Sequence, residues 1–145
     1  MQKIEKRNSD QMIYDAKIPI RLAYTNNVDV PNVISLWFMK IDDKIYCATQ
    51  KSAKIISYLK KNPVCGFEIA ADKPPYKGVR GNGSAKIIDD MGKNILQLLM
   101  KKYLGEKESG LSKFLKNNSH NEVAIEITPK NLFYYDYSSR MKDVS

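Results

Sequence analysis

Metal-binding side chains are scarce in this sequence. It contains one histidine, His120, and two cysteines, Cys47 and Cys65, with no paired-cysteine spacing. A zinc site needs several such ligands at close spacing, so we expect no metal centre. Both cysteines lie in apolar, strand-like runs, which predicts buried structural thiols rather than a disulfide or a reactive pair.

Long apolar runs are missing as well. The uncharged stretch at 30–39 is too short and too polar to span a bilayer, so we expect no membrane segment. Residues 1–7 are highly charged and lack the apolar core of a secretory signal, which predicts a cytoplasmic protein. The 145 residues, 43% of them hydrophobic, suffice for one domain with a sizeable core. We place that domain at 17–140, between a polar lead-in at 1–16 and a tail at 141–145.

Common nucleotide-binding and hydrolytic motifs are absent. No phosphate-binding GxxxxGK[ST] loop occurs, and Gly78, Gly81 and Gly83 stand in the wrong order and context for a dinucleotide turn. The carboxylates show no paired arrangement suited to glycoside chemistry. No motif pairs His120 with a nucleophile. The sequence therefore identifies no catalytic residue.

Basic charge, in contrast, is abundant: the net charge is +8. This balance suits a nucleic acid, an anionic membrane or a phosphorylated ligand, but also a merely solvated lysine-rich surface. The lysines follow no single strand or helix face, whereas a nucleic-acid site needs charges aligned along a groove. We therefore expect no specific nucleic-acid binding. A basic barrel that stacks bases on the aromatic residues at 133–137 remains the alternative from another functional class.

Periodicity along the chain predicts a mainly β protein. Apolar patterning predicts strands at 18–25, 33–39, 44–48, 64–70, 76–88, 122–127 and 132–137. It predicts a helix around 9–16, a helix that ends at Asn62–Pro63, a helix at 89–105 with Asp89 and Asp90 as caps, and a helix at 111–115. A turn at 128–131 is expected to separate the last two strands. This order predicts a small antiparallel barrel with helices outside.

The segment from Thr49 to Lys54 joins the third strand to the following helix through hydroxyls and lysines. Ser52 is a candidate N-cap. Hydroxyls, the free amides of a helix's first turn and the ammonium groups of Lys51 and Lys54 would form a cradle for a dianionic phosphate. The alternative is an ordinary capped surface helix with its lysines in solvent. The local sequence leaves both interpretations open.

The order of several segments resembles the pyridoxamine-phosphate-oxidase-like split barrels. These segments are VISLWF, a turn, KIYCAT, QKSAK, a helix, NPVCGFEIA, YKGVRGNGSAKIID and LFYYDY, from Arg21 to Tyr137. That family contains flavin mononucleotide (FMN) binders and deazaflavin binders. The resemblance implies an FMN cofactor, with a deazaflavin coenzyme as the alternative. It also implies a homodimer with its cofactor sites at the subunit interface.

The resemblance also assigns residues to the cofactor. Members bind the flavin phosphate where the third strand meets the helix, often through a T…S-[RK]-K pattern, and their second strand lies along the flavin ring. Ala53 replaces a residue that is basic in many members, and Lys51 stands close enough to compensate. The predicted cofactor-binding residues are Ser35, Leu36, Trp37, Phe38, Thr49, Gln50, Lys51, Ser52, Lys54 and Arg80.

Two of these assignments have a second interpretation. Trp37 is either a core aromatic on a buried strand or a contact to the flavin ring. Arg80 is either a partner in a salt bridge or a cofactor contact supplied by the second subunit. The sequence does not choose between them.

The activity implied is that of a flavin-dependent oxidoreductase, or a flavin carrier, whose substrate the sequence does not identify. Members that oxidise pyridoxamine phosphate carry basic side chains on the second strand and near the C-terminus. Here the second strand offers Val33 and Phe38, and the last strand offers Tyr135, Asp136 and Tyr137 where relatives often show Trp-Asp. We therefore do not expect pyridoxamine phosphate oxidation. A deazaflavin-dependent reductase, whose longer acidic cofactor suits the +8 charge, is the alternative within the fold.

Overall fold

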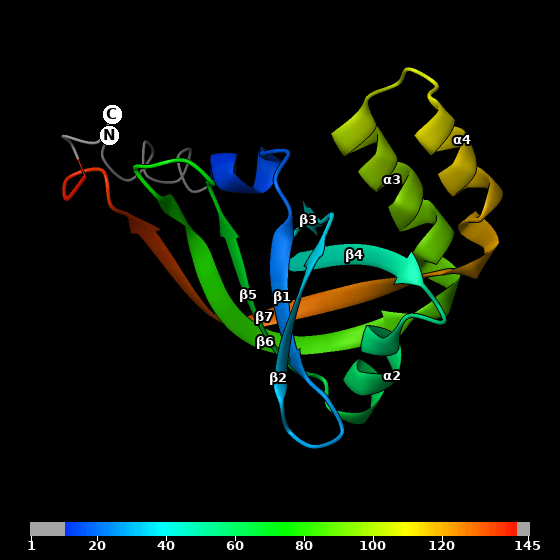
Figure 1. The fold of residues 1–145 in the computed structure, drawn as a ribbon, viewed down its shortest axis with the longest axis horizontal. Coiled ribbons are helices and arrows are strands. Elements are labelled where there is room, and N and C mark those ends of the chain that lie inside the picture. The colour runs from blue at the N-terminus through cyan, green and yellow to red at the C-terminus, as the bar shows by residue number, and fades with distance from the viewer. Residues whose placement is uncertain (1–10, 142–145) are drawn as a thin grey trace.

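One antiparallel sheet dominates the computed structural model, which describes residues 11–141 (Figure 1). Within that range the strands are β1 (Ile20–Thr25), β2 (Pro31–Leu36), β3 (Met39–Ile41), β4 (Lys44–Gln50), β5 (Val64–Ala70), β6 (Lys77–Ile88) and β7 (Glu122–Asp136). They lie in the order β2-β1-β5-β6-β7-β4-β3, and each neighbouring pair is antiparallel. The prediction of a mainly β, antiparallel fold is confirmed.

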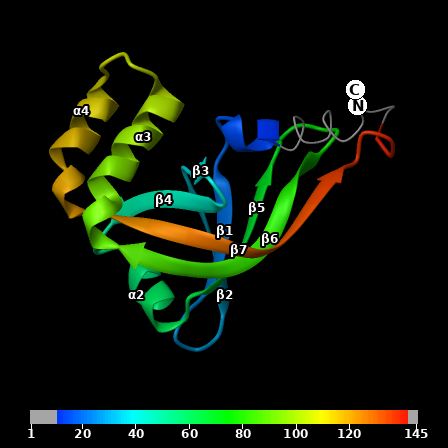
Figure 2. The same ribbon diagram turned by 180° about the vertical axis from the view of Figure 1, so that it is seen from behind.

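The sheet curls around an apolar core. The long strands β6 and β7 bend through the middle of the molecule and stay paired along their length (Figures 1 and 2). In β5, Cys65, Phe67 and Ile69 alternate inward, which is why this strand has the predicted bounds. Fully buried side chains of the other strands include Ile20, Leu22, Ile45, Val79, Ile125 and Ile127.

The last strand differs from the prediction, because β7 runs without a break through the expected turn at 128–131. Pro129 pairs with Gly83 at a register shift between Asn82 and Gly83. A proline has no backbone N–H to donate, and an irregularity in the ladder is where a strand tolerates one. Gly83 is also needed there, since an added Cβ would overlap the carbonyl of Thr128 and lie 2.9 Å from Pro129 Cα.

The predicted strand at 33–39 is also wrong in its bounds, because it divides into β2 and β3. These two strands form opposite edges of the sheet, so the chain must cross between them at Trp37 and Phe38. The N–H of Phe38 donates to Tyr103 Oη at 3.2 Å instead of to a neighbouring strand. A hairpin follows, with Ile41 paired to Lys44.

Helices α2 (Lys54–Lys61), α3 (Gly92–Leu104) and α4 (Gly110–Asn117) pack outside the sheet (Figures 1 and 2). Helix α3 lies over β4 and β7, where Ile95 and Leu99 form a second buried cluster with Tyr46 and Ala124. It begins at Gly92, where an added Cβ would overlap the backbone of Glu122. The start of α3 therefore lies directly on the start of β7.

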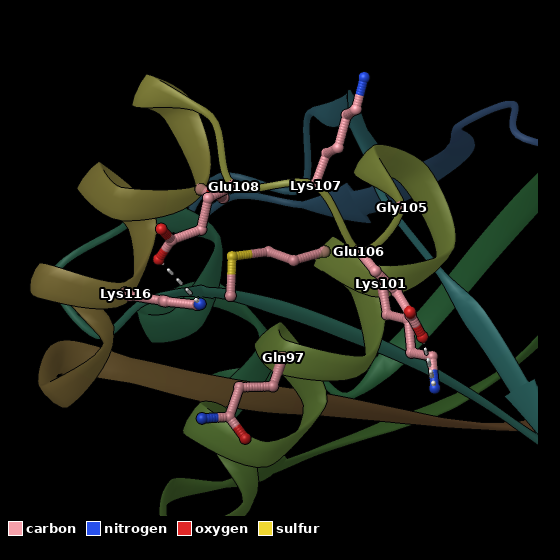
Figure 3. Close-up of a pocket in the computed structure, with 9 residues that line it drawn as sticks. Gln97, Lys101, Gly105, Glu106, Lys107, Glu108 and Lys116 are labelled. Carbon is pink, nitrogen blue, oxygen red and sulfur yellow. Dashed lines mark ion pairs between the residues drawn. The ribbon is translucent and has the colours of Figure 1, made fainter.

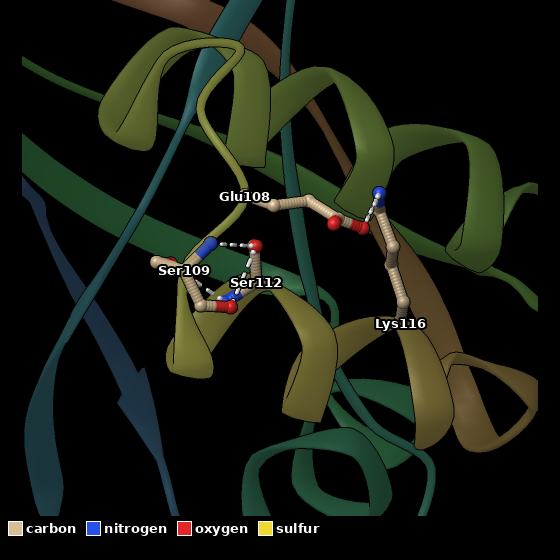
Figure 4. A network of polar contacts seen from close by, with 4 residues as sticks. All are labelled: Glu108, Ser109, Ser112 and Lys116. Atoms are coloured by element: carbon tan, nitrogen blue, oxygen red, sulfur yellow. Dashed lines mark hydrogen bonds and ion pairs between the residues drawn. The ribbon is translucent and has the colours of Figure 1, made fainter.

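The ends of α3 and α4 are defined locally. The predicted caps at the start of α3 are wrong, because Asp89 and Asp90 belong to the 3-10 helix η1 (Asp89–Met91) and cap nothing. Gly105 ends α3, with φ 75, at the end of the predicted range. Helix α4 starts with a capping box between Ser109 and Ser112 (Figure 4).

Both cysteines are buried and unpaired, as predicted. Burial raises the pKa of Cys47 to about 12 and that of Cys65 to about 11. The helix predicted around 9–16 begins outside the described residues, and the described part is helical at 11–15. Most of the predicted lead-in and tail also lies outside them. Across 11–141, no helix is both long enough and apolar enough to traverse a lipid bilayer.

Candidate functional site

A cavity of about 600 Å³ lies where the end of β4 meets α3 and α4. Apolar side chains make up most of its walls, and a few neutral polar groups and one carboxyl complete them. The lining residues are Ser35, Leu36, Trp37, Ala48, Thr49, Gln50, Leu96, Leu99, Leu111, Phe114, Leu115, Asn118 and Glu122. The structure thus brings together five of the predicted cofactor-binding residues: Ser35, Leu36, Trp37, Thr49 and Gln50.

Trp37 forms a flat aromatic wall of this cavity. Its ring stacks on Tyr103, with centroids 5.0 Å apart and planes inclined by 7°. Tyr103 is itself fixed, because its hydroxyl donates to the carbonyl of Ile18 at 2.7 Å. Trp37 is partly buried against the α3 cluster and also lines the cavity. Trp37 therefore packs against the core and also presents a surface that a ligand in the cavity could contact.

Phe38 lies outside the cavity, in the core. Its side chain is fully buried, and its carbonyl accepts a hydrogen bond from Lys102 Nζ at 2.9 Å. The same ammonium group lies 3.8 Å from the centroid of the Phe38 ring and donates to the carbonyl of Tyr14. Burial lowers the pKa of Lys102 to about 8. Phe38 thus anchors the crossing between β2 and β3 and thereby positions Trp37.

The predicted phosphate cradle directly follows Gln50 but does not line the cavity. Lys51, Ser52 and Lys54 are exposed in the turn that leads into α2. The prediction of Ser52 as N-cap is wrong: Ala53 holds that position, because its backbone is extended while its carbonyl accepts the first helical hydrogen bond, from the N–H of Ile56 at 3.1 Å. The first amides of α2 therefore have no side-chain cap. In the part of the chain that the structure describes, neither lysine has an ion pair.

Arg80 is not brought to this cavity. It lines a second hollow of about 570 Å³ on β6 and β7. Its guanidinium group lies 4.8 Å from the ring centroid of Phe133 and 5.7 Å from that of Tyr135. No acidic partner engages it among residues 11–141, so the salt-bridge interpretation has no support there.

The aromatic residues of the last strand are mostly tied into the fold. Tyr134 Oη is hydrogen-bonded to Tyr14 Oη at 2.6 Å, and Tyr135 Oη donates to Glu68 at 2.7 Å. Phe133 is the exposed exception, with 55% of its surface accessible. A base-stacking platform would need several free rings, so this arrangement does not favour the nucleic-acid alternative.

Glu122 is a cavity residue that the sequence analysis missed. It stands opposite Gln50 in the β4–β7 pairing, and Gln50 Nε2 donates to Glu122 Oε1 at 3.0 Å. Glu122 is only 8% exposed, and its Oε2 is buried without a hydrogen bond in the described structure. Burial raises the pKa of Glu122, and the bond from Gln50 opposes this only in part. The available signal was a charged residue opening the apolar run EVAIEI.

A third hollow, of about 360 Å³, lies between α3 and α4 (Figure 3). Two ion pairs border it: Lys101 with Glu106 at 3.7 Å, and Lys116 with Glu108 at 3.9 Å (Figures 3 and 4). All four side chains are more than half exposed, so each pair contributes little to stability. The charges of these two pairs neutralise each other, whereas Lys107, which also lines the hollow, has no ion pair among the described residues.

Comparison with known proteins identifies the fold. No protein-family model matches the sequence, and no curated protein matches it either. Among solved structures, an F420 reductase superposes with a TM-score of 0.72 at 16% identity, covering 85% of this chain and 94% of that one. A pyridoxamine 5'-phosphate oxidase described as putative, from Listeria innocua, gives 0.66 at 17%, covering 88% and 95%. An FAD-binding protein from Mesorhizobium loti gives 0.62 at 16%, covering 86% and 90%.

The chain therefore has the split-barrel fold of the pyridoxamine-phosphate-oxidase-like proteins, as the resemblance implied. At these identities the likeness establishes the fold alone. The names of the similar structures include an F420 reductase and an FAD-binding protein.

Proposed function

We propose that this protein binds FMN and acts as a flavin-dependent oxidoreductase or a flavin carrier. The observation that carries the proposal is the cavity beside β4. Five residues that the sequence linked to a cofactor line this one space of about 600 Å³. Ligand sites in proteins typically enclose about 300–1,000 Å³. The space is therefore adequate for a planar ring system.

The cavity walls suit a flat and largely apolar ring. Trp37 offers an aromatic face, and Leu96, Leu99 and Leu115 supply apolar contact. Its polar lining residues are few, as expected where polar groups orient a ligand rather than solvate it: Ser35, Thr49, Asn118 and the hydrogen-bonded pair of Gln50 and Glu122. The side chain of Ser35 accepts a hydrogen bond from Arg21, which fixes its orientation.

The turn before α2 suits the phosphate of the same cofactor. Lys51 and Lys54 are exposed and have no acidic partner among the described residues, so both charges are available. The first amides of α2 lack a side-chain cap, and such amides favour an anion. Since Gln50 lines the cavity and Lys51 follows it, one molecule could occupy both places.

A bound flavin would supply the hydride chemistry. The chain's residues would hold and orient it: the lysines of the turn would bind the phosphate, and Trp37 would contact the ring. The leucines of α3 and α4 would exclude water from the ring. Among the described residues that line the cavity, Glu122 is the one with an acidic side chain, and burial raises its pKa.

We also propose that the protein is a homodimer. Leu111 and Phe114 border the cavity yet are 49% and 63% exposed, and Val33 on the edge strand β2 is 68% exposed. Large apolar side chains at the mouth of a ligand site are typical of a surface that another chain covers. Arg80 would then reach the cofactor only from the second chain. Light scattering of the cofactor-bound protein at micromolar concentration should give a dimer, and a monomer would contradict this.

A deazaflavin coenzyme is the second candidate. The structural likeness to an F420 reductase favours it, as does the +8 charge, which would suit a longer acidic cofactor tail. Titrating the purified protein with FMN and with F420, followed by absorbance and mass analysis of any ligand that copurifies, separates the two. Absence of binding to both would overturn the proposed function.

The Lys54→Ala variant tests the phosphate position. Loss of one charge-assisted contact should weaken FMN binding by about 10- to 150-fold. Lys60→Ala is the matched control, because Lys60 is equally exposed but lies in the last turn of α2. An unchanged dissociation constant for Lys54→Ala would place the phosphate elsewhere.

A further inference from the structure

We propose that Glu122 acts as a neutral carboxylic acid that donates a hydrogen bond from Oε2 to an acceptor atom of the ring in the cavity. Glu122 would thus select a heterocycle with a carbonyl oxygen or an unprotonated ring nitrogen at this edge. The inference rests on the proposed flavin function and adds a specificity-determining residue to it.

The hydrogen bonds around Glu122 give its two oxygens different roles. Gln50 Nε2 can only donate, so Oε1 must be the acceptor in their 3.0 Å contact. Oε2 is buried and has no partner within the described chain. A buried polar atom without a partner costs about 1–3 kcal/mol, so such an atom calls for an explanation. A ligand in the cavity that Glu122 lines would supply the missing partner.

The neighbouring elements bring no charge that would keep Glu122 ionised. The cavity receives apolar side chains from α3 and α4, and neutral ones from β2 and β4. Charged or titratable groups on the elements packed around Glu122 are exposed and do not line the cavity. They are Lys51 after β4, Asp89 and Asp90 in η1, Lys93 on α3, Lys113 and Lys116 on α4, and His120 in η2 (Ser119–Asn121). The raised pKa of Glu122 agrees with this environment.

Gln50 holds the carboxyl in place for this role. Its side-chain amide also donates to the carbonyl of Asn118 at 3.5 Å, so the amide connects β4 to the segment before β7. With Oε1 fixed, a proton on the carboxyl must lie on Oε2. The Glu122→Gln variant reproduces this arrangement without titrating, because its carbonyl can accept from Gln50 while its NH2 donates in place of Oε2.

The test is an FMN titration, followed by flavin fluorescence, from about pH 5 to about pH 9 with wild type, Glu122→Gln and Glu122→Met. The FMN phosphate also titrates in this range, so each variant is compared with wild type at the same pH. We expect Glu122→Gln to match wild type at low pH and to bind about 10-fold more tightly at high pH, where wild-type Glu122 has lost its proton. Glu122→Met should bind about 10-fold more weakly than wild type at low pH.

A control and a ligand-free measurement complete the test. Glu126→Gln, on the same face of β7 but outside the cavity, should leave the affinity ratio to wild type unchanged with pH. Carbon-13 NMR of the ligand-free protein should show the Glu122 carboxyl titrating above the ordinary range. If the Glu122→Gln to wild-type ratio does not change with pH while FMN still binds, the role of Glu122 is overturned and the proposed function stands. If wild type binds neither flavin, both are overturned.

Discussion

Glu122 and Glu126 occupy the same face of β7, and their surroundings differ sharply. At Glu126, Lys44 Nζ donates to Oε1 at 3.2 Å and Tyr46 Oη donates to Oε2 at 2.9 Å. At Glu122, Gln50 satisfies one oxygen and the other has no described partner. Burial acts to raise the pKa of both carboxyls. At Glu126 the bonds from Tyr46 and Lys44 outweigh it and lower the pKa, whereas at Glu122 the pKa stays raised.

The comparison separates an acid that stabilises the sheet from one that the fold leaves available. Glu126 lies one period of the side-chain alternation further into β7 than Ala124, where cross-strand neighbours on β4 supply both donors. Glu122 lies at the end of the strand, where β4 turns away into α2 and the cavity takes the place of a neighbour. A carboxyl without a full set of partners therefore marks where the protein has room for another molecule.

Gly92→Ala should have the largest effect, because it would separate α3 from the Glu122 end of β7. An added Cβ would overlap the Glu122 carbonyl and lie 2.5 Å from the backbone nitrogen of Val123. Such overpacking against the backbone should lower the free energy of unfolding by about 3 kcal/mol. Urea denaturation followed by circular dichroism measures it.

Gly110→Ala is the matched control for that variant. Gly110 also begins a helix, but an added Cβ there would meet nothing within 4 Å. Alanine is the better helix former, so stability should stay the same or rise slightly. Equal losses at both positions would show that the contact between α3 and β7 is not the cause.

Glu126→Gln should have an intermediate effect. It replaces the charged acceptor of two donors, so we expect a loss of about 1–2 kcal/mol at neutral pH. A lowered folded-state pKa contributes stability above the ordinary value of 4.5, and this contribution disappears as the pH falls through the folded-state pKa. The difference from wild type should therefore shrink in acid. Denaturation at about pH 7 and about pH 3.5 checks this.

Glu122→Gln should have the smallest effect on stability, with the opposite sign and pH dependence. A raised folded-state pKa means that the protonated form favours folding, so wild type loses stability as the pH rises from 4.5 through the folded-state pKa. The amide does not titrate. The variant should therefore be more stable than wild type by about 1 kcal/mol at alkaline pH and equal to it in acid. A variant that is less stable at every pH would remove the contrast with Glu126.

The strands and helices could largely be predicted because their apolar periodicity is local. The alternation of Cys65, Phe67 and Ile69 predicted β5 with its observed bounds. The failures arose where a distant partner decides the structure. Pro129 continues a strand because Gly83 faces it. The chain leaves the sheet after β2 because Tyr103 Oη accepts a hydrogen bond from the backbone N–H of Phe38. No local pattern contains either partner.

The candidate site divides in the same way. The family pattern identified Ser35 in β2, Trp37 just after β2, and Gln50 at the end of β4. The fold does place these three residues around one cavity. The pattern gave no reason to select Glu122, since its importance depends on the cross-strand position of Gln50 and on the covering of α3 and α4. A buried polar atom without a partner is a property of packing and is visible only in three dimensions.

The burial of Cys47 and Cys65 makes the protein suitable for site-specific labelling. The thiolate is the reactive form of cysteine, and pKa values of about 12 and 11 keep both thiols protonated at neutral pH. A maleimide should therefore react with a new surface cysteine, such as that of Lys60→Cys, and leave the native pair untouched. Donor and acceptor dyes attached there in two separate populations would test the proposed homodimer through exchange of its subunits, without removing either natural cysteine.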